Sequence, residues 1–338
     1  MNKNISPALA AIKDLYDANF PTNKMDDLKK NFGLLKTADE HSQAGIFSSR
    51  IDADSFIKKN TGISFPLAIV SNFTYHPITN QLRSRLLAQG IYPEFYLSDY
   101  NQYHYEFLDS NSELYQSKPR LSLCLLDEHA IFDDLAPNWK IEQLERALDQ
   151  KLVQLTTYAE HYHHNCQGLL LFTSLPLSAN RLKQFVDYKM RAKVNHLWHQ
   201  FNARLSTLSE QFKHVFIIDS YSLMHGEATL CDQRLAFYTK AYMSIELLDQ
   251  IANEVAAIIR AQCGMAKKCL VLDLDNTLWG GILGDDGLDG IELSNTPIGE
   301  AHLDFQRNIK RLSEQGIILA ISSKNDKVNV DKALAQRQ

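Results

Sequence analysis

The stretch LVLDLDNT at Leu270–Thr277 decides the fold, because a short apolar run leads directly into two acidic residues. Such a run predicts a strand that carries Asp273 and Asp275 at its carboxyl end. Asp273 can coordinate a hard cation and attack phosphorus, and Asp275 can donate a proton and later accept one. Asn276 and Thr277 lie in a turn whose N–H groups can cradle phosphate oxygens. The alternative is an acidic strand-to-helix turn that Thr277 caps.

Two later segments fit the same chemistry. Five of the chain's 14 glycines fall within Gly280–Gly290, which predicts a compact flap rather than a helix or a long lid. The apolar run Ile317–Ile321 then ends in polar residues and predicts a second parallel strand. We expect Ser323 at its tip to hold the transferring phosphoryl group, with Lys324 and Asn325 as further phosphate-binding candidates.

The chain before this segment predicts a parallel α/β domain preceded by helices. Apolar residues recur at helical spacing in residues 1–63, whereas short apolar runs alternate with longer helical patterns after residue 64. This alternation implies right-handed crossovers and a mainly parallel sheet with helices on both faces. The predicted strands are Phe65–Val70, Tyr92–Leu97, Leu121–Leu126, Gly168–Phe172 and Val215–Ile218.

Polar residues at the carboxyl ends of these strands are candidate ligand-binding residues, because ligands bind there in parallel sheets. Ser71, Asn72 and Thr74 follow the first strand and can bind an acyl or pantetheine group, with a simple turn as the alternative. Asp219 follows the fifth strand and begins a loop that continues to Gly226.

Composition limits the partners and the compartment. The 338 residues carry a formal net charge of −5, so we expect no nucleic-acid partner. No apolar run approaches the roughly 18 residues that span a bilayer, so we expect no membrane partner. The five cysteines show no metal-site spacing and the N-terminus shows no secretory pattern, which predicts a cytoplasmic protein with free thiols.

These motifs together resemble the FkbH-like branch of the HAD (haloacid dehalogenase-like) superfamily, subfamily IIIC-like, over Lys267–Lys327. The resemblance rests on DLDNTLWGG at 273–281, GDDG at 284–287, Phe305-Gln306 and SKND at 323–326. It implies three regions: helices over 1–63, a flavodoxin-like domain similar to SGNH hydrolases over 64–265, and an incomplete Rossmann-like HAD core over 266–338.

The resemblance also implies roles for single residues. Asp273 is the expected nucleophile and Mg²⁺ ligand. Asp275 is the expected general acid and base, and its backbone carbonyl joins the Mg²⁺ site. Ser323 is the expected second-motif hydroxyl.

Three functions are open, two implied by the resemblance and a third by an incomplete HAD domain. The first is phosphoryl and glyceryl transfer from 1,3-bisphosphoglycerate, a phosphorylated three-carbon donor, to an acyl carrier protein in polyketide biosynthesis. The second is a Mg²⁺-dependent phosphatase in surface-polysaccharide assembly or secondary metabolism. The third is a non-catalytic binding module.

The chain departs from the resembled patterns in two places. The third HAD motif, a lysine, and the fourth, an acidic pair, cannot be placed between Ser323 and Gln338, so we expect a truncated HAD domain. The Gly-Asp-Ser of SGNH hydrolases is replaced by VSNFT at Val70–Thr74, and Asp219 and His225 do not have the Asp-x-x-His spacing. An intact Ser-His-Asp esterase is therefore disfavoured.

One basic stretch has two interpretations. Arg181–Arg204 holds six basic residues against a single acidic one, beside an apolar stripe at helical spacing. A solvated face of a core helix is the simpler interpretation, and docking of an acidic carrier protein is the alternative.

Overall fold

The computed structural model describes residues 5–224, 230–231, 236, 238–293 and 296–336. The chain divides into two compact units, Met1–Arg260 and Ala261–Gln338. Helices and parallel strands build both units, which confirms the predicted α/β class. The predicted division into 1–63, 64–265 and 266–338 stays a prediction, because compactness separates only two units.

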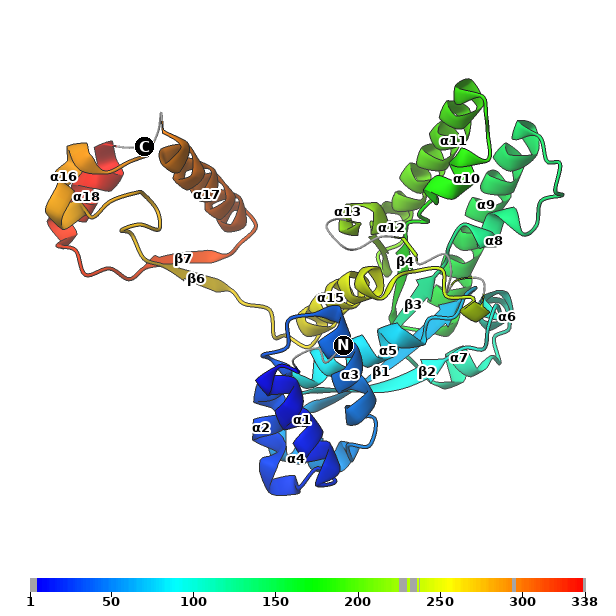
Figure 1. The fold of residues 1–338 in the computed structure, drawn as a ribbon, viewed down its shortest axis with the longest axis horizontal. Helices are drawn as coiled ribbons and strands as arrows, with labels where there is room; N and C mark the ends of the chain where they lie inside the picture. Colours follow the sequence, from blue (N-terminus) through cyan, green and yellow to red (C-terminus); the bar gives the residue numbers. More distant parts are fainter. Residues whose placement is uncertain (1–4, 225–229, 232–235, 237, 294–295, 337–338) are drawn as a thin grey trace. The chain divides into compact units, whose positions relative to one another are not determined.

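A five-stranded parallel sheet forms the centre of the first unit (Figure 1). Its order is β2-β1-β3-β4-β5, so β1 and β3 are neighbours from which the chain continues in opposite directions. This pair is the switch point of the sheet, where ligands bind in open parallel sheets. The five predicted strands are confirmed as β1 (Ile63–Ser71), β2 (Ile91–Leu97), β3 (Leu121–Leu125), β4 (Leu169–Thr173) and β5 (Val215–Ile218).

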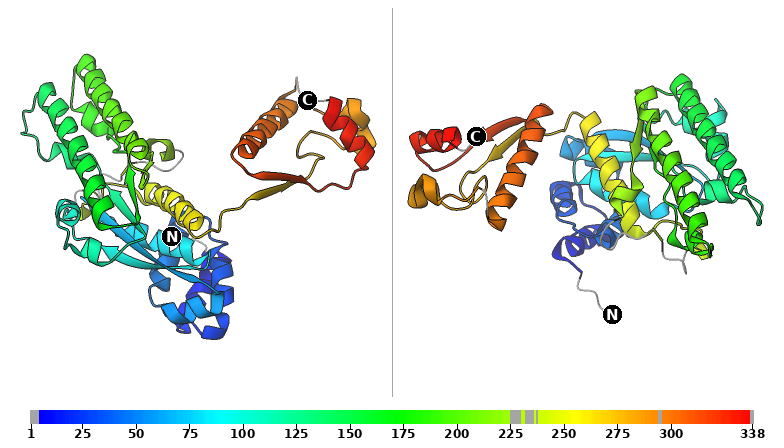
Figure 2. Two further views of the ribbon diagram at one scale, coloured as in Figure 1. Left: turned by 180° about the vertical axis from the view of Figure 1, so that it is seen from behind. Right: turned by 90° about the horizontal axis from the view of Figure 1, so that it is seen from above.

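Helices cover both faces of this sheet. Ala68, Val70 and Phe172 point to one face and belong to the apolar cluster that includes α9 and α11, two helices that lie side by side in Figure 2. Leu67 and Ile69 alternate with them along β1 and are also fully buried, so the other face is covered as well. Among the described residues of this unit, the helices after β1 are α5 (His76–Leu87), α6 (Tyr103–Leu108), α7 (Glu113–Gln116), α8 (His129–Phe132), α9 (Ile141–Asn165), α10 (Ala179–Lys183), α11 (Tyr188–Ser206), α12 (Leu208–Gln211), α13 (Ser220–Leu223) and α15 (Ile245–Gln262).

The first residues form a small helical layer with its own apolar cluster. Gly45 brings this layer against α5, because a Cβ at this position would lie 2.1 Å from the backbone oxygen of Asn80. His41 adds a buried hydrogen bond to Ser84 of α5 at 2.8 Å. The elements are α1 (Pro7–Asp17), η1 (Thr22–Lys24), α2 (Met25–Phe32), α3 (Ala38–Ser48) and α4 (Ala53–Asn60).

The second unit pairs two parallel strands, β6 (Cys269–Leu272) and β7 (Ile318–Ile321). Its helices are α16 (Leu283–Gly290), α17 (Pro297–Glu314) and α18 (Lys327–Gln336). The expectation of a flap without a helix was therefore wrong for α16. Gly287 alone leaves the helical conformation there, with φ of 66°, and divides the segment into two helical pieces. Within the described residues, no helix is both long and apolar enough to span a membrane.

Truncating a core leucine on α9 tests the packing of the first unit. Leu155 is fully buried, whereas Val153 on the same helix is 65% exposed. We expect Leu155→Ala to lower the free energy of unfolding by about 2–5 kcal/mol, because it removes packed apolar volume. Val153→Ala is the matched control and should change it by less than about 0.5 kcal/mol. Urea unfolding followed by circular dichroism measures both, and equal effects would contradict the packing described.

Candidate functional site

The carboxyl ends of β6 and β7 meet and place the predicted HAD-like residues together. Leu272 pairs with Ile321, and the N–H of Ser322 donates to the Leu272 carbonyl at 2.9 Å. Asp273 and Ser323 come directly after these positions, so both lie at the same edge of the sheet. This placement is what the sequence predicted from two parallel strands ending in polar residues.

Asp275 is the centre of the hydrogen bonds at this edge. Its Oδ1 accepts from the indole Nε1 of Trp279 at 3.1 Å and from the N–H of Leu283 at 3.0 Å. Its Oδ2 accepts from Nδ2 of Asn325 at 2.8 Å, and the same nitrogen lies 3.2 Å from the hydroxyl of Ser323. The side-chain amide of Asn325 therefore connects the carboxylate of Asp275, which follows β6, to the hydroxyl of Ser323, which follows β7.

These hydrogen bonds also set the protonation of Asp275. Burial raises the pKa of this carboxyl, but the bonds from Leu283, Asn325 and Trp279 outweigh burial, and the pKa is lowered from its ordinary value. The side chain is therefore an ionised carboxylate near neutral pH. In this state it can accept a proton, and it can donate one only after it has been protonated.

Asp273 is exposed, unlike the buried Leu272 and Leu274 on either side of it. Its Oδ1 accepts the N–H of Leu274 at 2.8 Å, and within the described residues nothing else is bonded to its carboxylate. An exposed carboxylate with one free oxygen at a strand end can reach a phosphorus atom or a cation in solvent.

The side chain of Asn276 braces the turn. Its Oδ1 accepts the N–H of Gly281 at 3.0 Å, while its own N–H donates to the Gly281 carbonyl at 3.2 Å. A φ of 52° at Asn276 and 95° at Gly281 allows this reciprocal pair, and both residue types tolerate such angles. Lys324 is exposed. The phosphate-binding roles of Asn276, Thr277, Ser323, Lys324 and Asn325 stay predictions.

Two side chains of α17 fix the turn from outside. The ring Nδ1 of His302 lies 2.9 Å from the carbonyl oxygen of Thr277, and Nε2 of Gln306 donates to the carbonyl of Leu278 at 2.6 Å. Gln306 was part of the quoted resemblance, but His302 was missed. The available signal was its spacing of four residues from Gln306, which puts both side chains on one helix face.

The donor set at this turn fits a hard cation in part. Among the described residues there is no group of three or more His, Cys, Asp or Glu side chains that could hold a metal ion. The carboxylate of Asp273 and the backbone carbonyl of Asp275 are two hard oxygen donors. Magnesium commonly binds proteins through one or two such oxygens and completes its shell with water and substrate phosphate.

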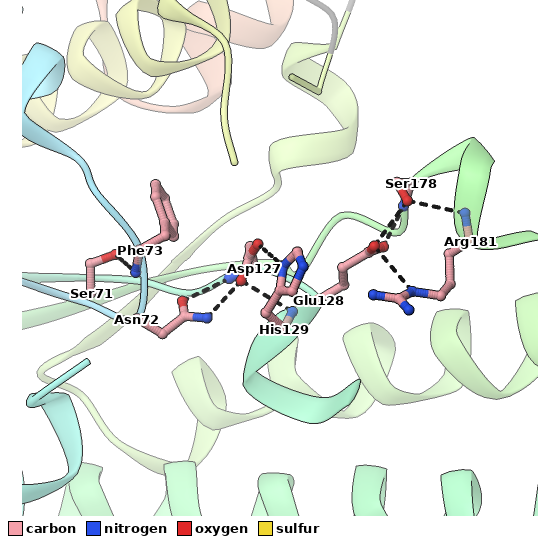
Figure 3. A network of polar contacts seen from close by, with 8 residues as sticks. All are labelled: Ser71, Asn72, Phe73, Asp127, Glu128, His129, Ser178 and Arg181. Atoms are coloured by element: carbon pink, nitrogen blue, oxygen red, sulfur yellow. Dashed lines mark hydrogen bonds and ion pairs between the residues drawn. The ribbon is translucent and has the colours of Figure 1, made fainter. Parts of the chain in front are cut away.

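A second polar network lies at the switch point of the first unit (Figure 3). Asn72, after β1, donates its Nδ2 to Oδ1 of Asp127, after β3, at 2.6 Å, and accepts the Asp127 N–H on its own Oδ1 at 3.1 Å. Oδ2 of Asp127 lies 2.6 Å from the ring Nδ1 of His129. Since a carboxylate only accepts, Nδ1 of His129 carries the proton and its Nε2 faces away from Asp127.

A third acidic side chain extends this network. The carboxylate of Glu128 accepts from the N–H and hydroxyl of Ser178 at 2.7 and 2.9 Å, and from Nε of Arg181 at 3.3 Å. The guanidinium of Arg181 lies over the ring of Phe132, 4.3 Å from its centroid. The sequence analysis missed Asp127, Glu128, His129 and Ser178, and it named Arg181 only as part of a basic stretch. Asp-Glu-His directly after a predicted strand was the signal.

The other predicted residues of the first unit have mostly structural partners. Ser71 is fully buried, and its hydroxyl oxygen accepts the Phe73 N–H at 3.1 Å. The N–H of Thr74 donates to the carbonyl of Lys240 at 2.9 Å. Asp219 accepts from the Ser174 hydroxyl at 3.0 Å and caps α13. Their ligand-binding roles stay predictions, and His225 and Gly226 lie outside the described residues.

These two units define an α/β protein whose polar residues gather at the carboxyl ends of parallel strands. The family described as FkbH, N-terminal domain, matches residues 67–260. The match covers more than half of the chain, so the protein belongs to the FkbH family, which confirms the resemblance.

A solved structure supports the fold. It is described as the N-terminal part of the protein BF1531 from Bacteroides fragilis, containing a phosphatase domain, complexed with Mg. It is 23% identical, with a TM-score of 0.75, and the match covers 90% of this chain and 77% of that one. No curated protein matches the chain.

Replacing the amide that connects the strand ends tests the Asp275 network. Asn325→Asp removes the donor to Asp275 and places a second carboxylate beside it, so we expect the pKa of Asp275 to rise. Asn329→Asp, an exposed position on α18 in the same unit, adds the same charge and should leave this pKa nearly unchanged. Carboxyl ¹³C NMR titration measures both, and an unchanged Asp275 in the first variant would contradict the network.

Asp127 raises the pKa of His129. Burial lowers the His129 pKa, but the hydrogen bond to Asp127 and the charges of Asp127, Asp133 and Glu128 outweigh it, so the pKa is raised. The stability that protonated His129 contributes is thus fully present below its unfolded pKa and is lost as pH rises through the folded pKa.

We expect Asp127→Asn to lower the His129 pKa more than Asp133→Asn does. Imidazole NMR titration measures this, and the reverse order would refute the assignment.

Proposed function

We propose that the protein is a HAD-type enzyme in which Asp273 is the nucleophile of phosphoryl transfer. One observation carries this proposal: an exposed Asp273 and a hydrogen-bonded Asp275 lie at the tip of β6, beside Ser323 at the tip of the adjacent β7. Nucleophile, proton-transfer group and phosphate-binding hydroxyl are three of the parts that this chemistry requires. The phosphatase domain described for the similar Bacteroides fragilis structure supports the same class.

The reaction assigns a separate task to each residue. The carboxylate of Asp273 attacks phosphorus, the bond from phosphorus to the leaving oxygen breaks, and a phosphoaspartate forms. Water then attacks this phosphorus, the bond from phosphorus to the Asp273 oxygen breaks, and the water passes a proton to Asp275, which can accept it because it is ionised. In the first step Asp275 must already hold a proton, which it gives to the leaving oxygen. Ser323 and Lys324 hold the phosphoryl oxygens during both steps.

Magnesium is the expected cofactor of this site. The carboxylate of Asp273 and the carbonyl oxygen of Asp275 would hold it. When bound, the ion neutralises the charge of the phosphoryl group. The Mg in the similar Bacteroides fragilis structure supports this choice.

The proposed donor is 1,3-bisphosphoglycerate, and the proposed acceptor is the thiol of an acyl carrier protein. The thiol attacks the carbonyl carbon of the donor and the bond to the 1-phosphate breaks. The 3-phosphate is then transferred to Asp273 and hydrolysed, so that a glyceryl thioester remains. An acidic carrier needs a basic surface to dock on. Helix α11 and the segment before it expose Lys183, Lys189 and Lys193, and within the described residues none of the three forms an ion pair. This arrangement supports the carrier protein as partner.

Mixing the chain with 1,3-bisphosphoglycerate, Mg²⁺ and a carrier protein tests the proposal. A carrier that gains the mass of a glyceryl group in the mass spectrum supports glyceryl transfer. Release of phosphate with an unmodified carrier supports a phosphatase instead. If neither product forms, both enzymatic functions fail and the binding module remains.

Substituting the nucleophile tests the phosphoaspartate directly. We expect Asp273→Asn to lower turnover by about three orders of magnitude or more, because the amide cannot form the covalent intermediate. Asp289→Asn, an exposed position on α16, removes the same charge from the same unit and should retain full activity. Phosphate release per minute measures both variants, and turnover that survives in Asp273→Asn would exclude this mechanism.

A further inference from the structure

A cavity of about 630 Å³ opens beside the polar network of the first unit. His129 and Arg181 both line it, and so do Lys240 and Tyr242. It lies at the carboxyl edge of the five-stranded sheet, next to the β1–β3 switch point that Asn72 and Asp127 bridge. Parallel sheets place ligand sites at this position.

The acidic side chains next to the cavity are mostly used within the protein. Both oxygens of Asp127 accept hydrogen bonds, from Asn72 and from the backbone N–H and ring of His129. Both oxygens of Glu128 accept as well, from Ser178 and Arg181. The lone pairs that could bind a ligand cation are therefore largely occupied.

The basic side chains, in contrast, keep donors for a ligand. His129 uses Nδ1 on Asp127, and Arg181 uses Nε on Glu128. Within the described residues, no acceptor is bonded to His129 Nε2 or to the two outer nitrogens of Arg181. In Figure 3, the guanidinium group of Arg181 points toward His129.

Packing holds both donors in place. The ring of His129 stacks on Tyr242, with centroids 3.9 Å apart and planes 19° apart. Phe73 meets the same tyrosine in an edge contact. Arg181 is held between Glu128 and the face of Phe132. Donors that are fixed before binding lose little entropy when a ligand arrives.

We propose that this cavity binds a small molecule bearing an oxyanion group, a phosphate ester or a carboxylate, whose oxygens accept hydrogen bonds from His129 Nε2 and from the outer guanidinium nitrogens of Arg181. Lys240 supplies a further cation on the rim. Planar guanidinium and imidazolium donors match the oxygens of both groups and form strong charge-assisted bonds. Asp133, the remaining acidic residue of the lining, repels an anionic ligand. Binding is therefore restricted to molecules that accept hydrogen bonds from both His129 and Arg181.

The proposal makes binding and His129 protonation interdependent. The charged or titratable groups that face His129 are Asp127, Glu128, Asp133, Arg181, Lys240, Cys231 and Tyr242. An oxyanion that binds the imidazolium form must raise the His129 pKa, and by the same linkage its affinity must fall as pH rises through that pKa.

Titration of the intact chain with inorganic phosphate and, separately, with acetate tests the site. Imidazole NMR follows the His129 pKa at constant ionic strength, with chloride as the non-binding anion. We expect phosphate or acetate to raise this pKa until the effect saturates. A rise with phosphate alone indicates that the ligand is a phosphate ester, and a rise with acetate alone indicates that it is a carboxylate. If neither anion raises it above the chloride value, the proposal is overturned.

Variants test the two donors independently of that pKa. We expect His129→Gln and Arg181→Gln each to weaken binding of the effective anion by about tenfold or more, the loss expected for one charge-assisted hydrogen bond. His199→Gln and Arg204→Gln are matched controls: His199 is exposed on α11, and Arg204 pairs with Asp149 there. Unchanged affinity in folded His129→Gln and Arg181→Gln proteins would overturn the proposal. Circular dichroism establishes that each variant is folded.

Discussion

The parallel pairing of β6 with β7 is the constraint on which the candidate catalytic site depends. Parallel strands bring their carboxyl ends to the same edge, so residues about 50 positions apart in the chain arrive together. Asn325 then joins Asp275 to Ser323, and the hydrogen bonds to Asp275 keep it ionised. The register of these two short strands therefore determines both where Asp275 and Ser323 lie and how Asp275 is protonated.

The same constraint operates in the first unit with different side chains. Asn72 and Asp127 follow the neighbouring strands β1 and β3, and their paired hydrogen bonds close the switch point. This pairing fixes Asp127, and Asp127 in turn fixes the ring orientation of His129 and raises its pKa. In each unit, a carboxylate at the end of one strand therefore accepts a hydrogen bond from an asparagine that follows the neighbouring strand. The donor is the Nδ2 atom in both units.

The sequence was informative where structure is local. Buried parallel strands are continuous apolar runs, so all five strands of the first sheet were predicted. The two strands of the second sheet are also apolar runs and were predicted in the same way, although much of their surface is exposed. The meeting of Asp273 with Ser323 was predicted because strand ends of one sheet converge. In contrast, α16 was missed because glycine density favoured a flap, although only Gly287 leaves the helical conformation.

The network around His129 could not be predicted for a different reason. Its partners Asn72 and Arg181 lie 55 positions before Asp127 and 53 positions after Glu128. No spacing rule connects residues at such distances; only the strand order β1-β3-β4 does. Asp-Glu-His at 127–129 had the right position after a strand, but position alone did not separate it from an ordinary polar turn.

Much of the two-stranded sheet of the second unit is exposed. Its two strands leave Val271, Ile318 and Ile321 at 61%, 64% and 47% exposure, so the sheet itself buries little apolar surface. Stability at the turn must come from the small cluster that contains Leu274 and Trp279. Trp279 is 2% exposed and also donates its indole N–H to Asp275, so one side chain supplies both packing and orientation. Loss of packing at Trp279 would therefore release the carboxylate as well, because the same ring supports both.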